Sequence, residues 1–186
     1  MPGAIAAPSS QAADALAGSL LAPPCQQAGD RMAVDCKETA LTATALDDLP
    51  RPPCAELLGW QVLDADIARG WIRIGFEGRR EFLNPAGYIQ GGLLAAMLDD
   101  TMGPAVFAMT DGRMYTVTMD MTVSYLAPAR AGPLFGEGQV VQLGKSVGFL
   151  EAKLMDAAGT IVARATSTAR LVASEKALTA PLARSA

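Results

Sequence analysis

The sequence predicts an α+β domain in which a curved antiparallel sheet packs against a single long helix. Three features support this fold class: segments of alternating apolar and polar residues, one long apolar segment, and no strand–helix–strand alternation of the kind that parallel sheets need. The chain has 186 residues and 51% of them are hydrophobic, which is enough for one domain with a substantial core. We place this domain at residues 51–173.

Two strand regions lie on either side of the long apolar segment. Alternation on both sides of "ARG" predicts a hairpin with strands near 60–66 and 70–77. After the apolar segment, residues 113–129 alternate again, and residues 132–172 predict three more strands with turns at "LGKS" and "DAAGT". The expected order is therefore two strands, one helix and four strands.

The apolar segment at 91–109 is long enough for a helix, and a loop at 78–90 precedes it. Gly103 and Pro104 are expected either to kink this helix or to end it. A helix that is apolar on all sides must be covered on all sides. One sheet covers one side, so the other must meet a second subunit or another element.

The two ends of the chain differ from the domain. Residues 1–50 contain no aromatic residue and are rich in alanine, which predicts a disordered or loosely structured extension. Residues 174–186 are polar and alanine-rich and are expected to form a frayed tail. A short helix or turn is expected at 55–60, after the break "PRPPC".

Composition excludes several classes of function. The chain has no histidine, which rules out Ser-His-Asp and Cys-His catalysis and every metal site that contains histidine. Its net charge of −4 argues against a nucleic-acid partner, and no apolar run reaches the ~20 residues that span a membrane. The odd number and irregular spacing of Cys25, Cys36 and Cys54 suit neither a disulfide framework nor zinc, and we interpret them as thiols of a cytoplasmic protein.

The start of the predicted helix carries the first functional signal. Gly91 and Gly92 leave the first N–H groups open to close approach, and the N-terminus is the positive end of the helix dipole. These groups are suitable donors to an oxyanion, although glycines also serve simply to let helices pack closely.

Asp99 and Asp100 are the second signal, because two carboxylates lie inside the most apolar helix. Adjacent helix positions point about 100° apart, so one acid is expected to face a substrate and the other to bond locally or reach solvent. Eight residues separate Gly91 from Asp99, roughly 12 Å along the axis. One helix therefore does not supply both groups to one carbonyl, whereas two antiparallel copies do.

The spacing of Asn84, Gln90, Gly91-Gly92 and Asp99 resembles the N-x5-HGG-x6-D pattern of the hotdog-fold thioesterases of the phenylacetic-acid-degradation type. The later segment "VTMDMTVSYLAPARAG" resembles the following strand of that family, so the resemblance covers about residues 55–172. It implies a hotdog fold, in which a curved antiparallel sheet wraps around one long helix. It also implies acyl-CoA hydrolysis by homodimers, often paired into tetramers.

The resemblance also implies roles for individual residues. Asp99 would be the nucleophile or general base, Gly91 would polarise the thioester carbonyl through its N–H, and Asn84 would orient the water or the carbonyl. Thr118 would place the water or steady the carboxylate. Gln90 departs from the pattern, because the family often has histidine there; glutamine forms hydrogen bonds but does not carry a proton.

Phosphate contacts to CoA are expected from cations at strand ends. The resemblance places them at Arg130 and at Lys145-Ser146, although the charged side chains are equally consistent with solvated turns. A thiolate leaves without an acid catalyst, so the reaction requires no metal or cofactor. Two alternatives stay open: a hotdog module that binds acyl-CoA without cleaving it, and a hydratase, which the lack of histidine disfavours.

Overall fold

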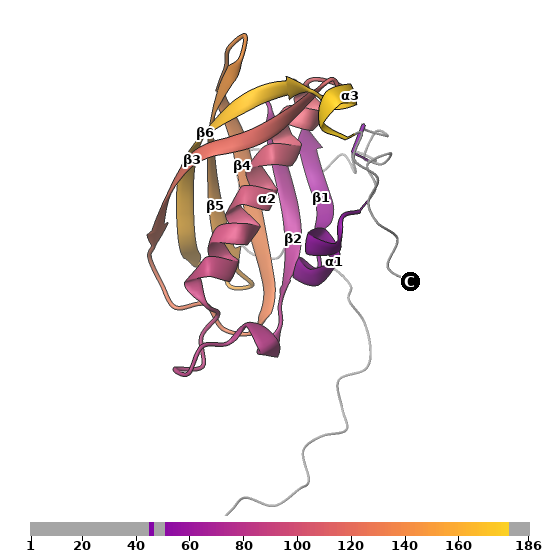
Figure 1. Cartoon of the computed structure of the whole chain (residues 1–186). Helices are drawn as coiled ribbons and strands as arrows, with labels where there is room; N and C mark the ends of the chain where they lie inside the picture. The colour runs from indigo at the N-terminus through magenta and orange to yellow at the C-terminus, as the bar shows by residue number, and fades with distance from the viewer. Residues whose placement is uncertain (1–44, 47–50, 179–186) are drawn as a thin grey trace, which may run out of the picture. The chain divides into compact units, whose positions relative to one another are not determined.

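The structure is a computed structural model that describes residues 45–46 and 51–178, which form a six-stranded sheet around one long helix (Figure 1). The strand order across the sheet is β1–β2–β4–β5–β6–β3, and all neighbours are antiparallel. The predicted α+β class and the order of elements are confirmed. The strands are β1 (Gln61–Asp66), β2 (Trp71–Gly78), β3 (Met114–Tyr125), β4 (Gly132–Leu143), β5 (Val147–Asp156) and β6 (Ile161–Ala173).

Helix α2 (Gly91–Met109) is the long helix that the sequence predicts, and it continues through Gly103 and Pro104 rather than ending there. The remaining helical segments are short: α1 (Pro53–Leu58), the 3-10 turn η1 (Arg80–Phe82) within the predicted loop, and α3 (Ser174–Ala177). Within residues 45–46 and 51–178, no helix combines the length and apolar character that crossing a membrane requires.

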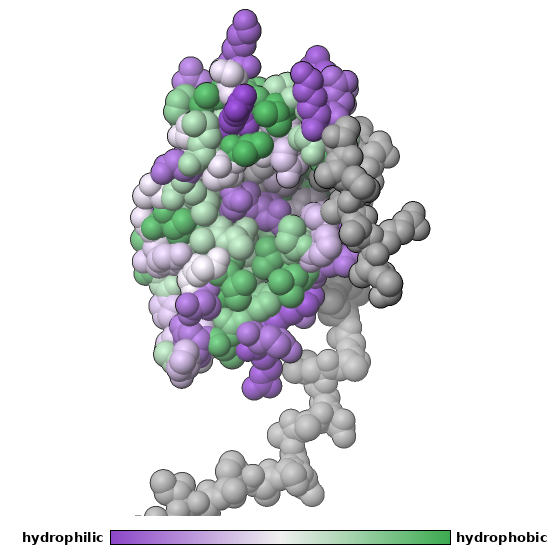
Figure 2. Space-filling view, in the orientation of Figure 1, coloured by the Kyte–Doolittle hydropathy of each residue, from purple (hydrophilic) through white to green (hydrophobic). Residues whose placement is uncertain are grey.

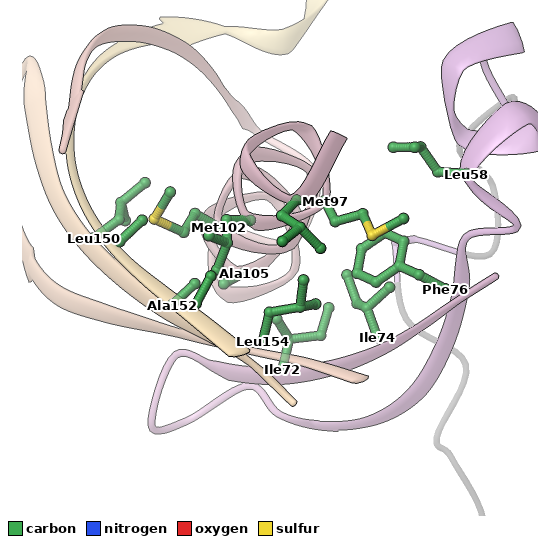
Figure 3. Packing of buried hydrophobic residues seen from close by; sticks show 14 of the residues in the cluster. Leu58, Ile72, Ile74, Phe76, Met97, Met102, Ala105, Leu150, Ala152 and Leu154 are labelled. Carbon is green, nitrogen blue, oxygen red and sulfur yellow. The ribbon is translucent and has the colours of Figure 1, made fainter. Parts of the chain in front are cut away.

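The core lies between α2 and the concave face of the sheet. Strand β2 shows the expected alternation, since Ile72, Ile74 and Phe76 are buried and point toward α2 (Figure 3). Met97, Leu98, Met102 and Val106 of α2 are almost fully buried against them. Burial of these side chains is the main source of stability, at roughly 1.5–3 kcal/mol for each large apolar side chain.

Strand β4 brings the helix unusually close to the sheet. A Cβ on Gly138 would lie 2.7 Å from the carbonyl oxygen of Thr101, and a Cβ on Gly136 would collide with the Thr101 hydroxyl. Two strand glycines therefore let the helix backbone approach β4 directly. The buried Thr101 hydroxyl donates to the carbonyl of Met97 at 2.7 Å, so this polar group is satisfied inside the core.

Both flanks contribute residues to the folded unit. Leu46, within the predicted extension, is only 5% exposed and belongs to the core cluster. At the other end, Ser174 is buried and its N–H donates to the carbonyl of Arg113 at 3.0 Å. The domain limits themselves stay a prediction. Cys25 and Cys36 lie outside the described residues, while Cys54 is a free, exposed thiol.

Candidate active site

Asp99 and Thr118, for which the family resemblance implies a shared role, lie in direct contact. Asp99 is on the exposed side of α2, and Thr118 is on the edge strand β3. The Thr118 hydroxyl donates to Asp99 Oδ1 at 2.8 Å. This bond fixes the orientation of the carboxylate and leaves Oδ2 available to a substrate or a water molecule.

A bulge in β3 allows two side chains of this strand, Thr118 and Tyr125, to contact α2 at different points along the helix. The register against β6 shifts between Thr118 and Asp120, so Met119 is an extra residue. Tyr125 follows Thr118 by seven positions and would face the opposite side of a regular strand. Because of the bulge it also faces α2, where its hydroxyl donates to the carbonyl of Gly91 at 2.9 Å. Tyr125 is a site residue that the sequence analysis missed.

The first turn of α2 offers two unused donors. The N–H groups of Leu93 and Leu94 bond to the carbonyl of Gln90, whereas those of Gly91 and Gly92 have no acceptor within the described part of the chain. The exposed Gln90 side chain does not cap the helix. A Cβ on Gly92 would have no heavy atom within 4 Å, so the space next to Gly92 is open, whereas a Cβ on Gly91 would lie 3.2 Å from the Tyr125 ring. This arrangement suits an oxyanion.

Pro104 creates an orphan carbonyl next to the acidic pair. Proline lacks the N–H that would bond to the carbonyl four residues earlier, which is that of Asp100. The indole of Trp60 supplies the missing donor, since its Nε1–H donates to that carbonyl at 3.1 Å. Trp60 thus allows the helix to continue through Pro104, and it holds the helix backbone at Asp100, next to Asp99.

The Asp100 side chain has a different environment from that of Asp99. Its Oδ2 atom is buried and has no hydrogen-bond partner among the described residues. Burial, and secondarily the nearby charge of Asp99, raises the pKa of Asp100 from 3.8 to about 6. The sequence predicts that the second acid bonds locally or reaches solvent, but within the described part of the chain Asp100 Oδ2 does neither, and the local hydrogen bond is made by Asp99 instead.

The two acids border one pocket with a volume of about 140 Å³, between α2, the first half of β3 and α1. Most of its walls are apolar or aromatic, while Thr118, Thr116 and the two acids provide polar groups. The lining residues on the helix and strand sides are Asp99, Asp100, Gly103, Pro104, Phe107, Tyr115, Thr116 and Thr118, with Trp60 and the start of α1 opposite.

Asn84 and Arg130 lie at the end of the sheet where α2 begins. Asn84 Oδ1 accepts the N–H groups of Ala86 at 2.9 Å and Tyr88 at 3.2 Å, so this oxygen shapes the loop and only the amide NH₂ is available to a ligand. The guanidinium of Arg130 stacks on the Tyr88 ring at 5.3 Å. The N–H of Ile89 donates to the carbonyl of Ala129 at 2.8 Å, which joins the two loops.

Lys145 and Ser146 lie at the opposite end. They form the turn after β4, whereas Arg130 precedes β4. The 12 residues of β4 span roughly 40 Å, so the strand separates the two groups by that distance. One chain therefore does not bring these three residues together. Gly91 and Asp99 are also apart, because α2 is continuous over the roughly 12 Å between them.

No group of three potential metal ligands (histidine, cysteine or carboxylate) occurs in residues 45–46 and 51–178.

Comparisons with known proteins agree with this architecture. A family model described as the thioesterase superfamily matches residues 86–163. A Halobacterium salinarum protein provisionally named an esterase is 33% identical over 115 residues, which cover 60% of this chain and 76% of the relative.

Two solved structures extend the comparison. The first is a Ralstonia eutropha JMP134 protein, described as related to phenylacetic acid degradation and provisionally as a thioesterase. It has a TM-score of 0.64 at 32% identity and covers 68% of this chain and 95% of its own. The second is a Streptococcus mutans protein bound to acetyl-CoA, with a TM-score of 0.56 at 20% identity over 61% of this chain and 89% of its own, a likeness that shows the fold alone.

The pairing of Trp60 with Pro104 predicts coupled effects on stability. Trp60→Phe should lower the free energy of unfolding by about 1–3 kcal/mol, because the carbonyl of Asp100 loses its donor. Pro104→Ala should raise stability and supply a helical N–H to that carbonyl. In the Pro104→Ala background, Trp60→Phe should therefore cost about 1 kcal/mol less. Urea unfolding of the four proteins measures this difference, and strictly additive effects would contradict the assignment.

The raised pKa of Asp100 predicts a pH-dependent stability. The folded pKa lies above the ordinary value, so the contribution of Asp100 to stability is fully present below pH 3.8 and is lost as the pH rises through about 6. Asp100→Asn should therefore gain stability relative to wild type between about pH 4 and pH 7. Thermal unfolding of both proteins at constant ionic strength tests this, and a constant difference across that range would contradict it.

Proposed function

Since the chain belongs to the thioesterase superfamily, we propose that it hydrolyses an acyl-CoA thioester to a carboxylic acid and CoA, with Asp99 as nucleophile or general base. The observation that supports this proposal is the hydrogen-bonded Asp99–Thr118 pair beside an apolar pocket. The acetyl-CoA bound to the Streptococcus mutans protein supports CoA as the carrier.

The proposed chemistry uses groups that the chain contains. The Asp99 carboxylate either attacks the thioester carbonyl, to form an anhydride that water hydrolyses after CoA leaves, or takes a proton from a water molecule that attacks the carbonyl directly. Thr118 keeps the carboxylate oriented in both routes. The developing oxyanion accepts hydrogen bonds from the N–H groups of Gly91 and Gly92. Asn84 contributes its amide NH₂ to the carbonyl or the water. CoA leaves as a thiolate, so the missing histidine is not required.

We propose that two chains build each site. The exposed face of α2 carries Gly92, Ala96 and Asp99, whose small size permits a second helix to approach. The edge strand β3 next to it also exposes apolar side chains, including Met119 and Tyr125, which are 63% and 53% exposed. Figure 2 shows apolar surface on this side of the molecule, with a hydrophilic area within it. An antiparallel partner would cover this surface and bring Asp99 of one chain to Gly91 of the other.

The antiparallel arrangement would also bring together Arg130 and Lys145, two cations that lie at opposite ends of β4 in a single chain. The partner's sheet would be reversed, so Lys145 and Ser146 of one chain would approach the end that carries Arg130 and Gln90 of the other. We propose that these groups contact the CoA phosphates and that Gln90 forms a neutral hydrogen bond to the bound thioester. Pairing of such dimers into tetramers and the cytoplasmic location remain predictions.

Asp99→Asn should lower kcat by 10²–10⁴-fold for every acyl-CoA that the wild type cleaves, because the anionic group is lost from a nearly isosteric side chain. Release of free thiol across short, medium, long and aromatic acyl-CoAs measures this. Asp100→Asn is the matched comparison and should cost much less on unsubstituted acyl groups. Equal losses would contradict the role of Asp99, and binding of acyl-CoA without thiol release would favour the non-catalytic module.

Mixed dimers test the shared site. Asp99→Asn and Gly91→Pro chains should each be inactive, since the second change removes the donor N–H. A random mixture should regain about a quarter of wild-type activity, because half the dimers are hybrids with one intact site. Gly91→Ala is the control, because it keeps the N–H. Like the proline, the alanine adds a Cβ, which would lie 3.2 Å from the Tyr125 ring. Inactive hybrids would show that each site lies within one chain.

A further inference from the structure

The proposed mechanism leaves the Asp100 side chain unused, although it borders the same pocket as Asp99. The Trp60 indole donates to the backbone carbonyl of Asp100, which holds in place the backbone that carries the carboxyl group. Asp99 has Thr118 as a partner, whereas Asp100 Oδ2 is buried without one among the described residues. A buried oxygen of this kind is costly unless a bound group satisfies it.

The other residues that line the pocket indicate what kind of ligand would carry the group that pairs with Asp100 Oδ2. Trp60, Phe107, Tyr115 and Pro104 provide apolar or aromatic surface around a space of about 140 Å³, which suits a compact acyl group. A charged ammonium group would have to give up its hydration among these apolar walls and would pair only with an ionised carboxylate, whereas a neutral polar group avoids that cost. The matching ligand is therefore an apolar acyl group that carries one neutral polar group.

The chemistry of a carboxyl group narrows the choice further. An ionised carboxylate only accepts hydrogen bonds, whereas the protonated acid both donates and accepts. A hydroxyl group pairs with either form, while a carbonyl group pairs only with the acid. Because burial and the charge of Asp99 raise the pKa of Asp100 to about 6, both forms are accessible near neutral pH. A hydroxyl is thus the group that suits this site across the working range.

We propose that Asp100 is a specificity-determining residue that binds a hydroxyl group on a compact acyl chain, so that hydroxyacyl-CoAs are preferred over their unsubstituted counterparts. This inference rests on the proposed thioesterase function and names the class of its substrate. An acyl group without the hydroxyl would fill the pocket but leave Asp100 unpaired. The expected preference in kcat/KM is about tenfold or more, since sites that bind a hydroxyl reject analogues that lack one.

The test compares butanoyl-CoA with its 2-, 3- and 4-hydroxy isomers, and hexanoyl-CoA with the same isomers, by release of free thiol. Wild type should prefer at least one hydroxy isomer by about tenfold. Asp100→Leu, which has a similar size but no polar atom, should lower that ratio to about one and should fold at least as stably. Asp100→Asn keeps a hydrogen-bonding group and should retain the ratio within about threefold.

Each outcome bears on the proposal. Hydrolysis without preference for any hydroxy isomer, or a preference that persists in Asp100→Leu, would overturn the role of Asp100 while the thioesterase function stands. Absence of thiol release from every thioester would overturn the proposed function and this inference with it. Loss of the preference in Asp100→Leu, with its partial retention in Asp100→Asn and thermal unfolding that shows both variants to be folded, would support it.

Discussion

The close approach of α2 to strand β4 is the constraint on which the candidate site depends. At Thr101 the helix lies against Gly136 and Gly138, where no Cβ separates strand from helix. Apolar packing then fixes the rotation of the helix about its axis, since Met97, Leu98 and Met102 are buried around the same position. Once Thr101 faces the sheet, Asp99 is turned away from it. The exposure of one acid is therefore a consequence of how the core packs.

A second anchor acts from the side of α1 and β1. Proline in the interior of a helix ordinarily costs about 3 kcal/mol and leaves a carbonyl unpaired. Here the indole of Trp60 bonds to the Asp100 carbonyl that Pro104 leaves without a donor. The helix therefore remains continuous, and the segment with both acids is held between β4 on one side and Trp60 on the other. Such local rigidity benefits a group that must meet a reacting carbonyl within tenths of an ångström.

The edge strand β3 connects the two ends of the site. Its bulge aligns Thr118 with Asp99 and Tyr125 with Gly91, so a single strand orients both the carboxylate and the first turn of α2. The same strand is unpaired on its outer side within the described chain and displays apolar side chains. The strand that organises the chemistry is thus also the surface that a second copy of the chain would cover. This links assembly to activity in the proposed enzyme.

The sequence by itself determined the elements and the identity of the main candidate residues. Alternation with a period of two residues located the strands, and the length of one apolar run located the 19-residue α2, because both are local properties of the sequence. The sequence predicts that Pro104 kinks or ends the helix, because proline removes one helical hydrogen bond. No local pattern indicates that Trp60, 40 residues before Asp100, supplies a donor to the carbonyl that the proline leaves unpaired.

Only the tertiary structure decided which residues meet. Thr118 and Asp99 are 19 residues apart, and Tyr125 and Gly91 are 34 apart. Both contacts depend on a one-residue bulge that reverses which side chains of β3 face α2, and an apolar–polar pattern does not reveal such a shift in advance. The different environments of Asp99 and Asp100 likewise follow from rotation of the helix against β4, which long-range packing sets and adjacent positions in the sequence do not.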